Sequence, residues 1–160
     1  MVGSVPVAER PVEVRPVQGG DFDAWLPLWK GYQAFYQMEI PASVTLTTWE
    51  RFLSPAEPMY AAVAVMGDRA LGLVHSIHHR SAWTTNDHCY LQDLFVADHA
   101  RGRSVGRALI EHVYADAKHR GASRVYWVTH ESNHGAMRLY DRVAHRVPVV
   151  QYRQEFGDSR

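Results

Sequence analysis

The sequence predicts a mixed α/β fold, in which helices flank a central sheet. The chain has 160 residues, within the roughly 100–200 expected of one domain. Hydrophobic residues make up 46% and charged residues 21% of it, which is typical of globular proteins and excludes a wholly disordered chain. Short apolar runs alternate with stretches of helical periodicity in the order β-α-α-β-β-β-α-β-α-β, so crossover helices are expected in the second half.

The N-terminal part contains an arm, a strand and a helix. Residues 1–11 show no periodicity and include two prolines, so we expect a flexible arm ahead of a single domain at 12–160. Spaced valines predict a strand over 12–17. Asp21 is placed to cap a helix that runs to residue 36, because aromatic and aliphatic residues recur at helical spacing after it.

A second helix and a hairpin follow. Thr47 and Glu50 have the spacing of a capping box, which predicts a short helix over 47–53. Apolar runs on either side of a Gly-Asp turn predict strands at 59–66 and 70–78.

The second half alternates strands with helices. A strongly apolar run predicts a strand at 90–96, and a stripe of apolar residues predicts a helix over 105–120 that ends at a glycine. The remaining elements are predicted as a strand at 124–129, a helix at 133–143 and a last strand at 149–156.

Charge and cysteine content exclude several classes of partner. The chain has 17 Lys and Arg and 17 Asp and Glu, so its formal net charge is zero, which argues against non-specific nucleic-acid binding. No window approaches the roughly 18 consecutive apolar residues of a membrane span, and no secretory signal begins the sequence. Cys89 is the only cysteine, which excludes an intrachain disulfide and a Cys-based zinc site. We therefore expect no nucleic-acid or membrane partner and a cytoplasmic location.

The stretch 101–106, Arg-Gly-Arg-Ser-Val-Gly, stands directly before a predicted helix. A helix N-terminus has unpaired N–H groups and attracts phosphate, glycines allow close approach of an anion, and arginines add bidentate donors. An ordinary Arg-rich surface loop remains the alternative.

The same residues also match the G-x-S-x-G nucleophile elbow of hydrolases around Ser104. However, seven residues, 97–103, separate this serine from the apolar strand, whereas in the elbow it follows the strand directly.

Two longer runs carry a family resemblance. YLQDLFVADHARGRSVGRALIEHVY and RVYWVTHESNHGAMRLYDRV resemble the core of the GCN5-related N-acetyltransferase (GNAT) superfamily, over about residues 60–156. The first contains the family's [Q/R]-x-x-G-x-[G/A] loop at 101–106, and the second its N-x-x-A-x-x-x-Y motif. Ser104 stands where the family has its first glycine, so a positive φ there would be strained. The N-terminal helices are similar to a bacterial branch related to Hpa-type and diamine/polyamine acetyltransferases.

The resemblance implies a bent, mostly antiparallel sheet flanked by about four helices, with two central strands that splay apart to admit acetyl-CoA. The strands at 90–96 and 124–129 would be these two. The residues that the resemblance assigns to acetyl-CoA binding lie on the strand, the loop and the later motif: Leu94, Phe95, Val96, Arg101, Gly102, Arg103, Ser104, Val105, Gly106, Asn133 and Ala136.

The implied reaction is direct transfer of an acetyl group to a primary amine in a ternary complex. Tyr140 occupies the family's position for the acid that protonates the departing thiolate, and a strand N–H near Val96 would stabilise charge on the acetyl oxygen. Relatives of the polyamine type carry an acidic residue at Gln92 and an aspartate at Asp93; simple alternation directs Asp93 to the opposite face of the strand from Gln92. Acceptor-side candidates are Tyr36, Glu39, Trp83, Gln92 and Asp93.

Several alternatives stay open. His78, His79 and His88 are further candidates for proton relay. The H-x-x-H-H spacing of His75, His78 and His79 splits the side chains across two faces of a strand, so we expect no metal. Because acidic residues that would recognise a polycation are sparse, we expect a small amine or amino acid as acceptor. The resemblance also implies a homodimer, since members of the family are often homodimers. The alternative functions are a non-catalytic acyl-CoA sensor on the same fold and a protein-lysine acetyltransferase.

Overall fold

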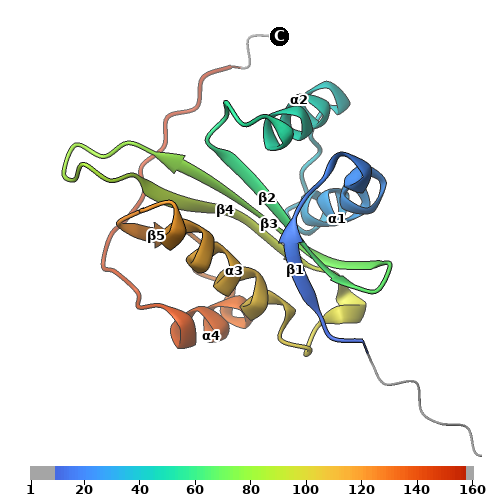
Figure 1. Ribbon diagram of the computed structural model, residues 1–160. Helices are drawn as coiled ribbons and strands as arrows, with labels where there is room; N and C mark the ends of the chain where they lie inside the picture. Colours follow the sequence, from blue (N-terminus) through green and yellow to red (C-terminus); the bar gives the residue numbers. More distant parts are fainter. Residues whose placement is uncertain (1–9, 158–160) are drawn as a thin grey trace, which may run out of the picture. The chain divides into compact units, whose positions relative to one another are not determined.

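The computed structural model describes residues 10–157 and divides the chain into two compact units (Figure 1). The first unit reaches to Val128 and the second begins at Thr129. Most of the predicted N-terminal arm, residues 1–9, lies outside the described residues. The assignment of 12–160 to a single domain stays a prediction, and each unit is described by itself below.

The first unit is built on a five-stranded mixed sheet in the order β1-β2-β3-β4-β5. Neighbouring strands are antiparallel, except that β4 and β5 are parallel. The mixed α/β fold predicted from the sequence is therefore confirmed. The strands are β1 (Glu13–Pro16), β2 (Met59–Met66), β3 (Arg69–His79), β4 (His88–Val96) and β5 (Arg124–Tyr126).

Helices α1 (Phe22–Phe35) and α2 (Ala42–Leu53) connect β1 to β2. Helix α1 begins directly after Asp21, as predicted, but the carboxylate of Asp21 accepts from Arg15 at 2.7 and 2.9 Å instead of capping the helix. The predicted start of α2 at Thr47 is wrong. Pro41 precedes the helix, which begins five residues before Thr47, and the Thr47 hydroxyl donates back to the Ser43 carbonyl at 3.1 Å.

The two faces of this sheet are covered by different helices (Figure 1). On one face, indole rings of α1 and α2 pack with β-strand aliphatics in a core that includes Trp25, Trp29, Trp49, Val63 and Leu73. Helix α3 (Val105–His119) covers the other face and buries Val105, Leu109, Ile110, Val113 and Ala117. A Cβ on Gly72 would lie 2.7 Å from the Phe95 carbonyl oxygen and 3.1 Å from Leu109. Glycine is therefore required for the close approach of α3 to β3.

The second unit contains α4 (His134–Val143) and an extended tail. The predicted last strand at 149–156 is wrong, because none of its residues is in a strand. A strand needs a partner for its backbone hydrogen bonds, and the side chains of Val149, Val150 and Tyr152 are 76%, 79% and 91% exposed. The predicted strand at 124–129 is also too long, since β5 ends at Tyr126.

No helix among residues 10–157 is long and apolar enough to cross a membrane.

Candidate active site

The turn before α3 has the backbone geometry of an anion-binding loop. A short 3-10 helix (Asp98–Ala100) follows β4, and Gly102 and Ser104 then have φ angles of 78° and 59°. The positive φ predicted to strain Ser104 is therefore observed, and its hydroxyl makes no capping hydrogen bond. Because the first N–H groups of α3 have no carbonyl one turn before them, they are available to an anion at this end.

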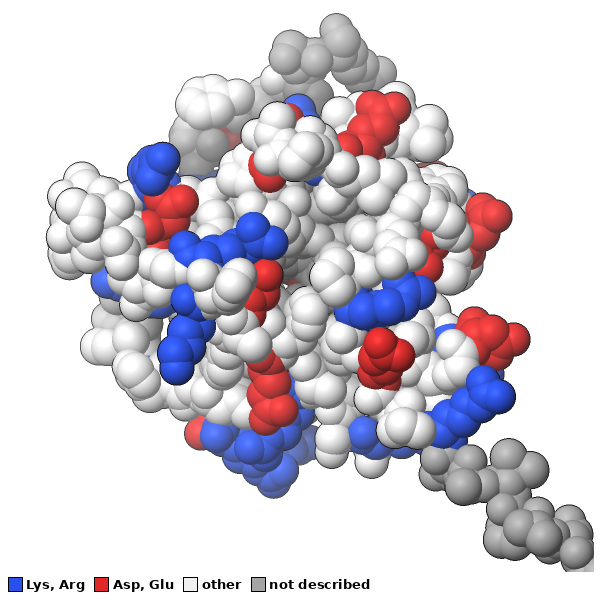
Figure 2. Space-filling model, in the orientation of Figure 1, with Lys and Arg blue, Asp and Glu red and all other residues white. Residues whose placement is uncertain are grey.

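Two arginines flank this turn. Arg101 pairs with Asp98 at 3.1 Å, and its side chain is 58% exposed. One nitrogen of Arg103 lies 3.9 Å from the Met66 sulfur. The exposed ion pair of Arg101 contributes little to stability, so its guanidinium group can turn to a phosphate. Elsewhere on the face in Figure 2, basic and acidic side chains are interspersed, in line with the zero net charge.

Strand β4 continues beyond the end of β5. The two strands pair only from His88 to Tyr90 on β4. Within residues 10–157, no strand pairs with this edge of β4 beyond Tyr90. The edge that includes Leu94, Phe95 and Val96 is therefore available to a ligand that binds as an added strand.

A β-bulge in β4 decides which way Asp93 faces. Asp93 pairs with His75, and Leu91 pairs with Ser76, so Gln92 is an extra residue between the two pairs. Since His75 and Ser76 are consecutive in β3, they face opposite sides of the sheet. Leu91 and Asp93 therefore also face opposite sides, so the regular alternation of side chains is interrupted at the bulge. Gln92 is exposed, whereas Asp93 is buried on the face covered by α1 and α2.

Asp93 belongs to a chain of buried polar groups that sequence reasoning missed. The Trp25 indole donates to His75 Nε2 at 3.0 Å, and His75 Nδ1 lies 2.9 Å from an Asp93 carboxylate oxygen. Burial and the nearby Asp93 carboxylate raise the pKa of Tyr32, on α1. We call these four residues the His75 network. The sequence did contain a signal for this network, because His75 and Asp93 are polar residues inside the apolar runs that form β3 and β4.

Of the predicted acceptor-side residues on α1 and its following loop, Tyr36 contacts the network. Tyr36 ends α1, is 41% exposed, and its ring lies 4.9 Å from that of Tyr32. Gln37, which follows it, has a positive φ of 53°. The loop is held by Gln33, whose side chain accepts the Ile40 N–H at 2.8 Å.

Glu39 and Trp83 are not part of the His75 network. Glu39 is exposed on the loop between α1 and α2. Trp83 is 89% exposed on the hairpin loop before His88. This loop lies at the opposite end of β4 from Val96, so the structure does not bring Trp83 beside Asp93.

The other histidines have separate environments. Burial lowers the pKa of His78 and of His88, and the Nε2 atom of each lacks a hydrogen-bond partner. His79 lies 2.7 Å from the Tyr126 hydroxyl and 2.8 Å from the Arg80 carbonyl oxygen, so both ring nitrogens are engaged. Among residues 10–157, no group of three or more His, Cys, Asp or Glu is placed to hold a metal.

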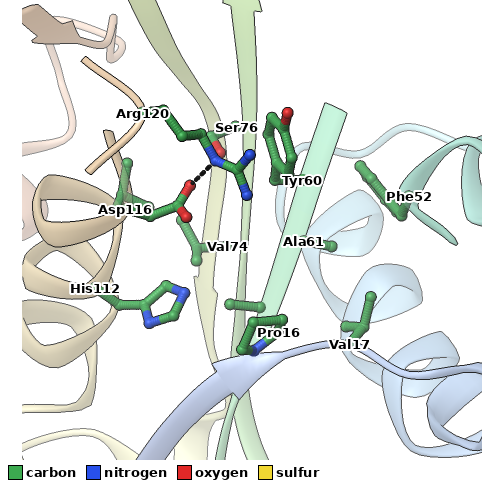
Figure 3. A pocket seen from close by; sticks show the side chains of 12 residues that line it. Pro16, Val17, Phe52, Tyr60, Ala61, Val74, Ser76, His112, Asp116 and Arg120 are labelled. Atoms are coloured by element: carbon green, nitrogen blue, oxygen red, sulfur yellow. Dashed lines mark hydrogen bonds and ion pairs between the residues drawn. The ribbon is translucent and has the colours of Figure 1, made fainter. Parts of the chain in front are cut away.

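A small cavity lies between α3 and the edge of β2 (Figure 3). In it, Arg120 is hydrogen-bonded to Asp116 at 2.8 Å and its guanidinium carbon lies 3.7 Å from the centre of the Tyr60 ring. The volume of about 70 Å³ accommodates a few water molecules. It is too small for a coenzyme, and none of the predicted site residues lines it.

The N-x-x-A-x-x-x-Y motif lies at the start of α4, in the second unit. Asn133 directly precedes the helix and donates from its side chain to Thr129 at 3.1 Å. Ala136 and Tyr140 are four residues apart on the helix, so they share one face.

Comparison with known proteins identifies the family. The sequence model of the Acetyltransferase (GNAT) family matches residues 24–145. The chain belongs to the GNAT family of acetyltransferases. The family match supports an acetyltransferase enzyme, and GNAT acetyltransferases use acetyl-CoA.

Individual GNAT proteins are similar along almost the whole chain. The chain is 38% identical over 146 residues to the D-amino-acid N-acetyltransferase HPA3 of Saccharomyces cerevisiae, covering 89% of this chain and 90% of the yeast protein. A probable acetyltransferase of known structure superposes with a TM-score of 0.81 at 22% identity, covering 92% and 99% of the two chains. AAC(6')-Iy in complex with a bisubstrate analog superposes with a TM-score of 0.78 at 18% identity, covering 91% of this chain and 99% of the other. These structural similarities confirm the GNAT fold.

Proposed function

We propose that this GNAT enzyme transfers the acetyl group of acetyl-CoA to the nitrogen of a small primary amine, with D-amino acids as the first acceptor class to test. The observation that carries the proposal is the 38% identity, along nine-tenths of both chains, to a D-amino-acid N-acetyltransferase. The opened edge of β4 and the turn before α3 support it from the geometry.

The residues of the first unit fit acetyl-CoA. Gly102 and Ser104 hold the positive φ angles that direct successive N–H groups of the turn toward an anion. Arg101 and Arg103 add charge beside it. The unpaired edge at Leu94–Val96 offers backbone groups to the amide-bearing arm of the coenzyme. In this proposal the residues 101–106 hold the diphosphate, and Asn133 and Ala136 border the coenzyme.

The proposed reaction needs a proton to leave the acceptor nitrogen and a proton to reach the departing sulfur. When bound, acetyl-CoA supplies the thioester that an amine can attack. A Lys-like amine with a reference pKa near 10.4 is only about one part in a thousand neutral near pH 7, so the site must favour proton loss. The Val96 N–H would donate to the acetyl oxygen, and the Tyr140 hydroxyl would hold the proton that the departing sulfur takes up.

An amine panel tests this proposal. Purified protein is incubated with acetyl-CoA and single acceptors, and thiol release is measured together with the acetylated product. Release that depends on a D-amino acid or a monoamine supports the proposal, whereas release only with lysine-containing peptides indicates a protein-lysine acetyltransferase. If acetyl-CoA raises the melting temperature but no amine is acetylated, the chain is an acyl-CoA sensor.

A serine hydrolase is not supported by the structure. Ser104 lies eight residues beyond the end of β4 at Val96, at the start of α3, whereas a nucleophile elbow places the serine directly after a strand. Labelling of Ser104 by a fluorophosphonate probe would support a serine hydrolase.

We further propose a homodimer in the cytoplasm. The tail from Val147 to Phe156 exposes five large apolar side chains in a pattern that is typical of a strand. We propose that this tail packs against a second copy of the chain. The free, buried thiol of Cys89 suits a reducing compartment. Sedimentation of the intact protein and of a Val149→Asp, Val150→Asp variant measures the oligomeric state; a wild-type monomer would contradict the dimer.

A further inference from the structure

The cavity between α3 and the edge of β2 has a polar side and an apolar side (Figure 3). His112, Asp116 and Arg120 are spaced four residues apart on α3 and at its C-cap, so they follow one side of the helix. Val17 and Ala61 are among the apolar residues that line the cavity. A ligand that fits it therefore combines polar groups with a small apolar part.

The guanidinium group of Arg120 is fixed in place, but its outer nitrogens are unused. Its Nε donates to Asp116 Oδ2 at 2.8 Å, and its central carbon lies 3.7 Å from the centre of the Tyr60 ring. Contact with an aromatic face restricts the plane of a guanidinium group. Among residues 10–157, neither Nη atom has a hydrogen-bond partner. The outer N–H groups match the two oxygens of a carboxylate.

The carboxylate of Asp116 also has an oxygen to spare. Its Oδ2 accepts from Arg120, whereas Oδ1 has no hydrogen-bond partner in the described part of the chain. The side chains of Arg120 and Asp116 are 38% and 28% exposed, so solutes can reach the cavity at this end. A free carboxylate oxygen is a strong acceptor for an ammonium group.

The charges that line the cavity cancel. Arg120 and Asp116 are the charged residues of its lining, and burial lowers the pKa of His112, so this ring is neutral near pH 7. A simple anion would be attracted by Arg120 but repelled by Asp116, and the reverse holds for a simple cation. A ligand with one positive and one negative charge meets an opposite charge at each end.

We propose that this cavity is a second binding site, for a small α-amino acid such as glycine, whose carboxylate binds Arg120 and whose ammonium group binds Asp116. The volume of about 70 Å³ limits the ligand to the smallest amino acids. None of the predicted coenzyme or acceptor residues lines the cavity, and the turn at 101–106 is at the other end of α3. The inference is thus independent of the proposed function.

Melting temperatures measured with three probes test the two-charge recognition. Glycine carries both charges, acetate carries the negative charge, and methylammonium carries the positive one. At about 20 mM glycine we expect the melting temperature of the wild type to rise by about 3 °C, with no change for the other two probes. An equal shift with acetate would overturn the two-charge recognition. No shift with glycine would mean that the cavity holds water only and would overturn the site.

Arg120→Met and Asp116→Asn locate the bound amino acid. Both variants nearly keep the size of the side chain and remove its charge, so each should abolish the shift with glycine. Asp116→Asn also leaves the guanidinium group without an opposing carboxylate, so acetate should now raise the melting temperature of this variant. A glycine shift that persists in Arg120→Met would place the amino acid elsewhere and overturn the site.

Arg107→Met is the matched control. Arg107 forms an ion pair of the same spacing on α3, with Glu111 at 2.9 Å, and does not line the cavity. Exposed pairs of this kind contribute little to stability, so both arginine variants should fold. Arg107→Met should keep the full glycine shift, and its loss there would contradict the cavity site. Thiol release from acetyl-CoA is measured separately, so failure of the site and failure of the proposed function are distinguishable.

Discussion

The turn before α3 carries its functional groups on six consecutive residues, 101–106, whereas the His75 network draws its side chains from α1, β3 and β4. Residues 101–104 of the turn are exposed. Trp25, His75 and Asp93 of the network are buried, and hydrogen bonds join Trp25 to His75 and His75 to Asp93. We expect that removing a side chain of the turn changes the stability of the protein little. Removing a side chain of the network should destabilise the fold.

The largest effect expected from this contrast is on stability. His75→Ala leaves the Trp25 N–H and the Asp93 carboxylate without their buried partner, so we expect the free energy of unfolding to fall by about 3 kcal/mol. Urea unfolding measures it. His79→Ala, at the exposed end of the same strand, is the control and should cost less than about 1 kcal/mol. A similar loss for both variants would contradict the contrast.

The second effect concerns the motif on α4. Tyr140→Phe removes the proposed acid and should lower kcat at least about 100-fold, with the Kd of acetyl-CoA nearly unchanged. Steady-state kinetics with the best acceptor of the panel and a binding titration measure the two quantities. Unchanged kcat would exclude Tyr140 from proton transfer.

A smaller effect is expected at the turn itself. Arg101→Ala combined with Arg103→Ala should weaken acetyl-CoA binding about tenfold without a change in melting temperature, because both side chains lie at the surface. Arg107→Ala is the matched control: it is 52% exposed and paired with Glu111 one turn further along α3. If the control weakens binding as much as the double variant does, the arginines act only through the general charge of this end of the helix.

The smallest effect concerns the strained backbone. Ser104 has a φ of 59°, which glycine adopts without steric cost. Ser104→Gly should therefore stabilise the protein by about 0.5–1 kcal/mol, with acetyl-CoA affinity maintained. Thermal unfolding with and without the coenzyme measures both. A destabilised variant would show that the serine side chain contributes a contact that outweighs the strain.

Hydrophobic periodicity was sufficient for most of the fold. The runs of apolar residues place β2, α3 and α4 within a residue or two of their observed ends. It failed for α2, where a cap-like pair lies inside the helix, and for residues 149–156, which alternate like a strand but have no strand beside them in the described chain. A strand is defined by its partner, and the pattern of one segment does not contain that information.

The sequence by itself determined the family, the glycine-containing turn before α3 and the strain at Ser104, because each depends on neighbouring residues and on allowed backbone angles. Only the tertiary structure decided the surroundings of Asp93. The bulge at Gln92 reverses the facing of the strand, and Trp25, fifty residues before His75, fixes the tautomer of that histidine. Both depend on the register between strands and on helix packing, which arise from contacts between distant segments.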